Sequence, residues 1–389
     1  MKTKKQNIVQ GTHLEKPFEY LIKQESNEIV LNWYQARRYV LDLLNNTLQE
    51  SESLPTGWHF IVYGDNELLL SVVRHLALYA HFTNYEEYDS DGKLSCKNRT
   101  HITIVSAKNA ADIENELQKP EYLCNLPKVS QMTIFGNVKN KDSYMDIAID
   151  VVKDKMEVGT YKNYKRIEIT EELISKQLAP LSHDQIFSID TRKAVCAGEA
   201  YNLGAVIGNL PYEDLHSVNR YSNALNTFQN KVLDCKINKL IKGEEEEKKW
   251  NTDPNVVRLG LSNVFCADCF EIREKEVNKL PLPKDKAELG PWGAHMNELS
   301  RCEHNRWIAE KLLLGYMPLG EEQIFKYEHL FGDDRKAYWK KLKNDPNSPM
   351  HIDICSNRDL RRRDPDSMKY DSFLMLAIPL ILRDIQENR

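Results

Sequence analysis

The chain has 389 residues, of which 41% are hydrophobic, and this length predicts two globular domains rather than one or three. It carries 53 Lys and Arg against 58 Asp and Glu, and no long basic stripe stands out. This balance argues against a nucleic acid as partner, because a phosphate backbone is bound by clustered positive charge.

Nothing in the sequence predicts export or direct membrane insertion. The N-terminal residues MKTKKQNIVQ run into polar residues instead of an apolar segment with a cleavage site. The apolar window 67–82 is broken by Arg74 and His75, and the window 373–382 is about half the roughly 20 residues that span a bilayer. The eight cysteines are scattered, which is typical of reduced thiols, so we expect a cytoplasmic protein.

The first third of the chain predicts a helix followed by the opening of a βαβ unit. Apolar and aromatic residues recur at helical spacing over 28–50, so residues 1–54 are expected to form an N-terminal helical extension. The apolar run HFIVYG at 59–64 predicts a strand, and leucines and valines in helical register predict a helix over 67–82.

Strands and helices then alternate, which favours a parallel, doubly wound sheet over about 55–180. The further strands are expected at 101–106, 131–136 and 166–170. The further helices are expected near 110–118 and 142–155.

From about residue 181 the pattern becomes mostly helical and predicts a second domain, 181–389. Its clearest early helices are expected at 190–205 and 220–241. The acidic run at 243–255 predicts a solvated loop, because consecutive like charges are not buried. A second loop is expected at 279–293, ahead of the strongest helix in the sequence.

The turn after the first strand lies where a Rossmann fold presents G-x-G-x-x-G to a pyrophosphate. Here Gly64 is the first glycine, but Asn66 and Leu69 replace the second and third. The next strand ends at Ser106 without the acidic residue that would hold a ribose hydroxyl. The segment resembles the TrkA-N type of Rossmann domain with its phosphate fingerprint eroded. Two interpretations remain open. One is a dinucleotide site that uses Gly64, Asp65, Asn66 and Ser106, and the other is a purely structural or repurposed scaffold.

The most specific signal is the helix expected over 299–316. Glu303, Arg306, Trp307 and Glu310 fall at i, i+3, i+4 and i+7, on one face of that helix. Neighbouring faces carry apolar residues, and Gly315 stands where a C-terminal cap is expected. The helix therefore combines a buried side with a side that carries two carboxylates, a guanidinium and an indole.

This helix resembles the RyR repeat of ryanodine receptors. The matching residues are Leu299, His304, Trp307, Gly315 and Tyr316, with Tyr316 in place of the usual tryptophan. A following segment matches at His351, Ile354 and Leu360 and departs at Ile352, which replaces a proline.

An upstream stretch, 210–225, resembles the more divergent half of the same module. It matches at Asn219 and Arg220 and departs at Val218, where serine is usual. The resemblance therefore implies two paired halves, at 185–240 and 294–385, joined by the acidic loop.

The resemblance implies a ligand pocket between the two halves. Aromatic faces beside Arg and carboxylates suit an adenine-like base, with Arg306 available for a phosphate. The expected ligand-binding residues are Asn219, Arg220, Glu303, Arg306, Trp307, Glu310, Tyr316 and His351. The competing interpretations are core packing of His304 and Trp307, and an ion-pair ladder that contributes a few tenths of a kcal/mol per pair.

Cys266 and Cys269 have C-x-x-C spacing, but no second pair accompanies them, so no metal site is expected. No nucleophile elbow, P-loop or HExxH motif occurs, and we predict neither catalytic residues nor a required cofactor. The preferred hypothesis is a sensor of a nucleotide or dinucleotide, with a protein partner or a second copy, and the resemblance implies bacterial antiphage or ion-transport signalling. The alternatives are an NAD(P)-dependent oxidoreductase or nucleotide hydrolase using Glu303, His304 or Glu310, and an interaction scaffold without a small ligand.

Overall fold

The computed structural model describes most of the chain. The described residues are 27–49, 57–88, 94–117, 145–154, 164–179, 191–207, 215–229, 262–278, 281–313, 316–345, 348–364 and 367–387. The expected strand at 131–136, the acidic loop at 243–255 and the expected cap at Gly315 lie outside them.

Four parallel strands form the main sheet, in the order β5-β4-β1-β6. They are β1 (Trp58–Tyr63), β4 (Thr100–Ser106), β5 (Ile147–Lys153) and β6 (Lys165–Ile169). Five of the six residues of β1 are buried, as is usual for a parallel strand covered on both faces. The predicted mixture of helices with a parallel sheet is confirmed, as are the strands expected near 59–64, 101–106 and 166–170.

One expected helix is a strand. The stretch 142–155 was predicted to be helical, but Ile147–Lys153 forms β5 and pairs with β4 along its whole length. Ile147, Ile149 and Val151 alternate with other residues, and β-branched side chains at a period of two favour a strand. The helical prediction was therefore wrong about the period. An unexpected antiparallel hairpin, β2 (Glu86–Tyr88) with β3 (Leu94–Lys97), precedes β4.

Helices flank the sheet along the first half of the chain. They are α2 (Asn27–Gln49), α3 (Glu67–Tyr79), α4 (Ala110–Leu117) and α6 (Glu171–Leu178). The helices expected over 28–50, 67–82 and 110–118 are confirmed, although α3 ends at Tyr79. The buried residues of α2 include Trp33, Tyr34 and Tyr39, and the helix packs along α3.

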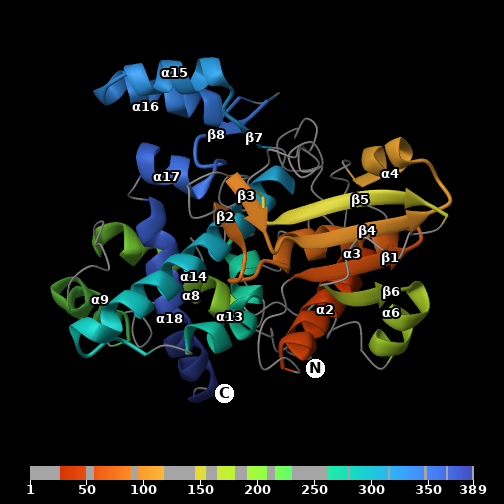
Figure 1. The fold of residues 1–389 in the computed structure, drawn as a ribbon, viewed down its shortest axis with the longest axis horizontal. Helices are drawn as coiled ribbons and strands as arrows, with labels where there is room; N and C mark the ends of the chain where they lie inside the picture. The colour runs from red at the N-terminus through yellow and green to blue at the C-terminus, as the bar shows by residue number, and fades with distance from the viewer. Residues whose placement is uncertain are drawn as a thin grey trace, which may run out of the picture.

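The second half of the chain is helical, as predicted. Its elements are α8 (Thr191–Ile207), α9 (Leu215–Thr227), α13 (Phe270–Val277), α14 (Lys286–Leu313), α17 (Asn357–Arg363) and α18 (Ser367–Glu387). Helix α18 packs on α8, α13 and α14 and so forms the centre of this part. In Figure 1 this helical part lies to the left of the sheet.

The loop expected at 279–293 is shorter than predicted. Helix α14 already begins at Lys286 and contains Pro291. The Asp285 carboxylate accepts hydrogen bonds from the backbone N–H groups of Ala287 and Glu288, at 2.8 and 3.1 Å. This side-chain cap lets the helix start before the proline, and a proline so close to the start removes few backbone hydrogen bonds.

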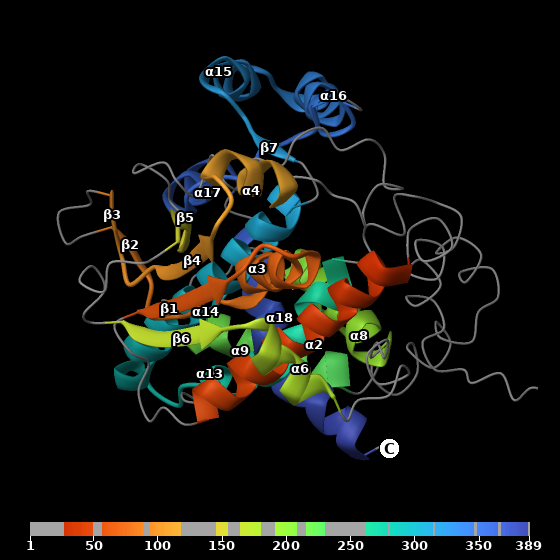
Figure 2. The same ribbon diagram turned by 90° about the vertical axis from the view of Figure 1, so that its right-hand side faces the viewer.

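A small helical hairpin projects from the body of the molecule. It consists of α15 (Glu321–His329) and α16 (Gly332–Lys343) and is joined by the two-residue strands β7 (Met317–Pro318) and β8 (Met350–His351). Neither α15 nor α16 has a buried residue. Figures 1 and 2 both place this hairpin at one end of the molecule.

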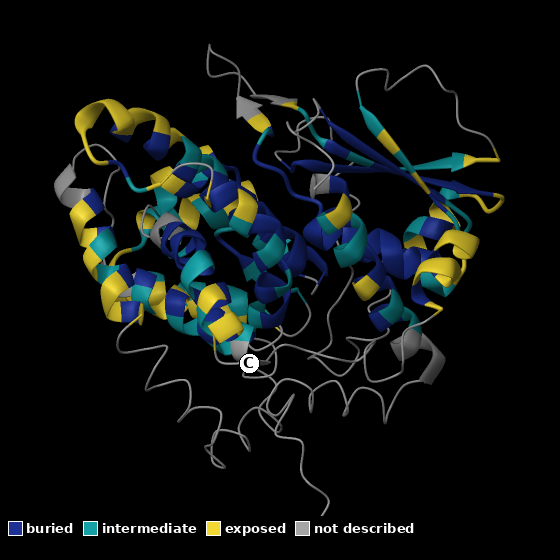
Figure 3. Ribbon diagram, turned by 90° about the horizontal axis from the view of Figure 1, so that it is seen from below, coloured by how far each residue is buried: buried dark blue, intermediate teal, exposed yellow. Residues whose placement is uncertain are grey.

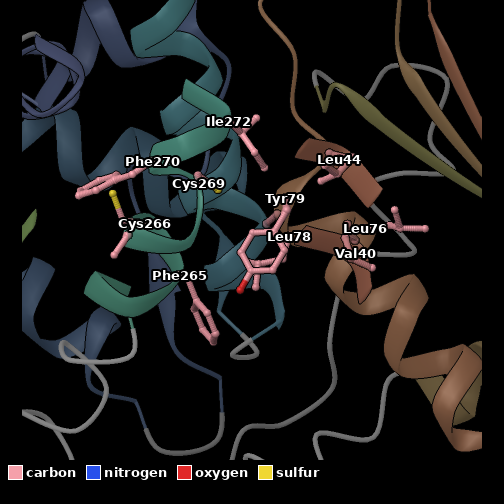
Figure 4. Close-up of a cluster of buried hydrophobic side chains, with 14 of the residues drawn as sticks. Val40, Leu44, Leu76, Leu78, Tyr79, Phe265, Cys266, Cys269, Phe270 and Ile272 are labelled. Atoms are coloured by element: carbon pink, nitrogen blue, oxygen red, sulfur yellow. The ribbon is translucent and has the colours of Figure 1, made fainter. Parts of the chain in front are cut away.

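The sheet and the helical part share one hydrophobic core. Apolar residues of α2 and α3 belong to a single buried cluster with Phe265, Cys269 and Phe270 (Figure 4). In Figure 3 the buried colour runs through the strands and the inner faces of the helices, with the exposed residues around them. None of the described helices is long and apolar enough to span a bilayer.

Charged groups cross the same interface. Arg37 on α2 forms a buried ion pair with Asp268, which also accepts a 2.6 Å hydrogen bond from the Tyr79 hydroxyl. Arg273 on α13 donates to the backbone carbonyl of His81 at 2.8 Å. The ion pair and the hydrogen bonds therefore fix the position of the sheet relative to the helical part, in addition to the apolar contacts.

Candidate functional site

The expected dinucleotide residues meet at the carboxyl edge of the sheet. Ser106 ends β4, and its hydroxyl donates to the Asp65 carboxylate at 2.8 Å. The Asn66 side chain caps α3 by accepting from the Leu69 backbone N–H at 2.9 Å. Its amide group also donates to the Glu171 carboxylate, at 2.7 Å, across the point where the chain order of the strands reverses.

This edge is unlike a pyrophosphate cradle. The side chains of Asn66 and Leu69 stand where glycines would leave room, and the N–H of Leu69 is already bonded to Asn66. The nearby carboxylates of Asp65 and Glu171 would repel a phosphate. The Nζ atom of Lys108 lies 3.8 Å from Asp65 and already pairs with that carboxylate. The geometry therefore supports the interpretation of a structural or repurposed α/β scaffold.

The backbone at this edge turns sharply at Gly64. Gly64 has φ +124°, and an added Cβ would lie 2.5 Å from Leu69 Cδ1. We expect Gly64→Ala to lower the free energy of unfolding by about 1–3 kcal/mol in urea titrations, because the backbone conformation is strained for an L-residue.

Gly290 provides the matched control for that substitution. It lies within α14, and an added Cβ would meet no atom within 4 Å. Gly290→Ala should therefore be neutral or stabilising by up to about 1 kcal/mol. Equal losses at both positions would contradict the strained turn.

The charged residues of α14 form a buried network. Arg306 Nε donates to both carboxylate oxygens of Glu303, at 2.9 and 3.0 Å, and its Nη1 donates to Glu310 at 3.0 Å. Glu310 also accepts from Lys311 at 2.6 Å and from the Ser262 hydroxyl at 2.9 Å. The spacing predicted that these groups would meet, and the structure adds that Arg306 is 1% exposed.

The network favours the charged forms of Arg306 and Glu310, whereas burial raises the pKa of Glu303. Burial alone would lower the pKa of Arg306, but Glu303 and Glu310 raise it well above its usual value. Burial alone would raise the pKa of Glu310, but Lys311 and Arg306 bring it below its usual value. The guanidinium is thus occupied by two carboxylates of its own helix, so it is not presented to a ligand phosphate as the sequence had suggested.

The C-x-x-C pair lies beside this network. Cys266 and Cys269 are both buried. Burial raises the pKa of the Cys266 thiol well above its usual value and that of Cys269 to about 12. Protonated thiols are poor nucleophiles and poor metal ligands. Within the described residues, no group of three or more His, Cys, Asp or Glu side chains is placed to hold a metal ion.

Two residues of α14, His304 and Trp307, belong to an aromatic cluster. It consists of His304, Trp307, Tyr316, Trp339 and His351, and His351 is its centre. The His351 ring makes edge contacts with Trp339, Trp307 and Tyr316, at centroid distances of 4.6, 4.8 and 6.1 Å. His304 stacks on Trp307 at 5.8 Å. Both tryptophans are half-buried, and the Nζ atoms of Lys311 and Lys343 lie 5.2 and 5.9 Å from the ring centroids of Trp307 and Trp339.

The cluster unites residues that the sequence suggested with one that it missed. Trp307, Tyr316 and His351 were expected to lie together, and they do. The sequence does not indicate a role for Trp339, because this residue lies on α16 among lysines and outside the repeat motifs. Only the packing of α16 against β8 brings it beside His351.

Acidic side chains lie beneath the aromatic cluster. His304 Nδ1 is 3.6 Å from Asp371, and its Nε2 lies 3.1 Å from the backbone carbonyl of Asp353. The Asp353 carboxylate lies 3.7 Å from His351 Nδ1, which accepts a hydrogen bond from the Asp353 backbone N–H at 3.3 Å. Burial and the neighbouring Asp364 raise the pKa of Asp353 to about 7. Neither Asp353 nor Asp371 was expected from the sequence.

The upstream half of the expected pocket is placed elsewhere. Asn219 and Arg220 are exposed on α9, which packs on α8 and α18. Figures 1 and 2 both place α9 away from β7 and the α15–α16 hairpin. The aromatic cluster is therefore built from α14, α16, Tyr316 just before β7, and His351 of β8.

The chain was also compared with known proteins. No protein-family model, no curated protein and no solved structure matches it. The resemblance to RyR repeats and to TrkA-N domains therefore stays a prediction, and the function is argued from the geometry of the site.

Proposed function

We propose that the protein is a ligand sensor that binds a planar, nucleotide-like ring at the aromatic cluster. One observation carries the proposal: two half-buried indoles, Trp307 and Trp339, flank His351 although they come from separate helices. Stacking on an aromatic face contributes about 1–3 kcal/mol per base and requires no phosphate contact. In this proposal a Rossmann-like sheet supports an RyR-like helical part, and the setting is cytoplasmic nucleotide signalling, such as antiphage defence or ion transport.

The buried network argues against Glu303 and Glu310 as the acid or base of the enzyme alternative. Glu303 and Glu310 are 2% and 0% exposed and paired with Arg306. A general acid or base must come within hydrogen-bond reach of its substrate. Neither carboxylate offers that access, so the proposal assigns them a structural role.

One observation favours the scaffold alternative. Phe325 and Phe331, on the α15–α16 hairpin, are 64% and 74% exposed. Exposed aromatic side chains of this kind are common at protein interfaces. They lie on the hairpin that carries Trp339, so a partner bound there would be coupled to the aromatic cluster.

Thermal unfolding with and without nucleotides tests the proposal. The panel is adenosine, ATP, NAD, ADP-ribose and cyclic nucleotides, and a ligand at 100 times its Kd stabilises the folded state by about 2.7 kcal/mol. We expect at least one to raise the Tm of the wild type, and Trp307→Ala to abolish that rise.

Two further variants serve as controls. Trp307→Phe keeps a ring and should retain part of the shift, whereas Phe331→Ala, on the exposed hairpin, should retain all of it. A shift that survives Trp307→Ala would place the ligand elsewhere. The absence of any shift would leave the interaction scaffold as the better account.

A further inference from the structure

The most exposed large apolar side chains of the described residues lie on the α15–α16 hairpin. They are Phe325 and Phe331, and neither helix of the hairpin has a buried residue. Figures 1 and 2 show the hairpin projecting beyond the sheet. Exposed aromatic side chains on a projecting element are typical of an interaction surface.

The outward face of α16 carries an ordered pattern of charge. Exposed residues recur at i, i+3, i+4, i+7 and i+8 along the helix and therefore form one face, namely Asp333, Lys336, Ala337, Lys340 and Lys341. The acidic residues lie in the first turn and the lysines cluster in the last turn. Trp339 is half-buried and contacts His351, so this face is separate from the aromatic cluster.

This face is complementary to itself in an antiparallel orientation. Ala337 lies four residues after Asp333 and four residues before Lys341. If two copies of α16 cross with Ala337 on a two-fold axis, Asp333 lies opposite the partner's Lys341, and each such pair occurs twice. The small side chain of Ala337 lets the two helices approach closely at the crossing point.

The helix dipole offers a simpler reason for part of the pattern. It favours acidic first turns and basic last turns in any helix. It does not require the charges to lie on one exposed face, symmetrically about an alanine, next to the exposed ring of Phe331. The combination therefore selects a second copy of this chain over a partner of uniform charge.

We propose that the outward face of α16 binds the same face of a second copy, so that the protein forms a two-fold dimer through its hairpins. Phe331 precedes the first turn of α16 and then packs against the methylene chains of the lysines that end the partner's α16. The charge pairs are open to solvent, so the dimer is reversible and weakens at high salt. This inference goes beyond the proposed function and does not rest on it, because the aromatic cluster is complete within one chain.

Charge exchange across the two-fold axis tests the inference. Sedimentation velocity of the full chain at micromolar concentrations and low salt should show a monomer–dimer equilibrium. Asp333→Lys and Lys341→Asp should each raise the dissociation constant on the order of tenfold or more, because each places like charges opposite one another twice. The double variant should restore the dimer, since its pairs are only reversed in sign. Both residues are exposed, so the variants should fold.

Glu172→Lys is the matched control for Asp333→Lys. It makes the same change of charge at an exposed position on α6, far from the hairpin in sequence, and should leave the dissociation constant unchanged. An equal loss in this control would mean that net charge alone drives association, which overturns the inference.

Disulfide cross-linking measures the position of the axis. Ala337→Cys should form a covalent dimer under a mild oxidant, because the two thiols meet at the crossing point. Asn344→Cys, at the end of the same helix, should not, because two copies of that position lie about 21 Å apart in the antiparallel pair. The wild type under the same oxidant gives the background from the native thiols.

The remaining outcomes contradict the inference in different ways. A chain that stays monomeric at every concentration has no such dimer and leaves the hairpin to an unlike partner. A dimer that tolerates Asp333→Lys forms through another surface. A double variant that stays as weak as the single variants shows that the charges do not face one another.

Discussion

Replacing Arg306 with methionine is expected to lower the free energy of unfolding by about 3–5 kcal/mol. The substitution preserves most of the side-chain volume, but it breaks the ion pair of Glu303 with Arg306 and weakens the neutralisation of Glu310. A loss of that size is a large share of the roughly 5–15 kcal/mol that stabilises a typical domain. Urea titration followed by circular dichroism measures it directly.

A double variant shows whether the loss of stability comes from an unpaired buried charge or from lost packing. In Arg306→Met with Glu303→Gln, the charge of Glu303 is removed together with that of Arg306, and Glu310 keeps Lys311. We expect this double variant to be more stable than Arg306→Met alone. A loss of only a few tenths of a kcal/mol in the single variant would mean that the pairs behave like an exposed helical ladder.

The second large effect is expected at the interface between the sheet and the helical part. Asp268→Asn removes the charge that neutralises Arg37, a buried guanidinium 8% exposed, and should lower the free energy of unfolding by about 3–5 kcal/mol. Asp268 also accepts a hydrogen bond from the Tyr79 hydroxyl. Because the two parts share one core, chemical unfolding should stay a single transition with a lower midpoint.

An exposed ion pair provides the control for Asp268. Lys176 and Glu172 pair on α6 with side chains 69% and 76% exposed. Glu172→Gln should change the stability by about 0.5 kcal/mol or less, because solvent screens the pair. Similar losses for Asp268→Asn and Glu172→Gln would show that burial adds nothing at the interface.

The sequence predicted the elements whose signal is local. Strand β4 is a run of β-branched residues, and the i, i+3 and i+4 spacing on α14 was sufficient to bring Glu303, Arg306 and Glu310 together. Strand β5 carried a local signal as well, but its alternation was assigned the wrong period. These features depend on neighbours within a few positions along the chain.

The features that sequence reasoning missed depend on distant contacts. The ion-pair network is buried in part because residues 262–268 cover it through Ser262. Trp339 reaches the aromatic cluster only through the packing of α16 on β8. Asn219 and Arg220 were assigned to the same pocket by resemblance, but α9 packs on α8 and α18. Spacing within one helix could not decide any of these placements.

The single core shared by the sheet and the helices limits how this chain can vary. Expressed without the helical part, α2 and α3 would expose a row of aliphatic and aromatic side chains and an Arg37 deprived of its carboxylate. We therefore expect that neither part folds on its own. Replacing the sheet with an unrelated domain by recombination would require compensating substitutions on both sides of the interface. The two parts are therefore expected to occur together in related chains.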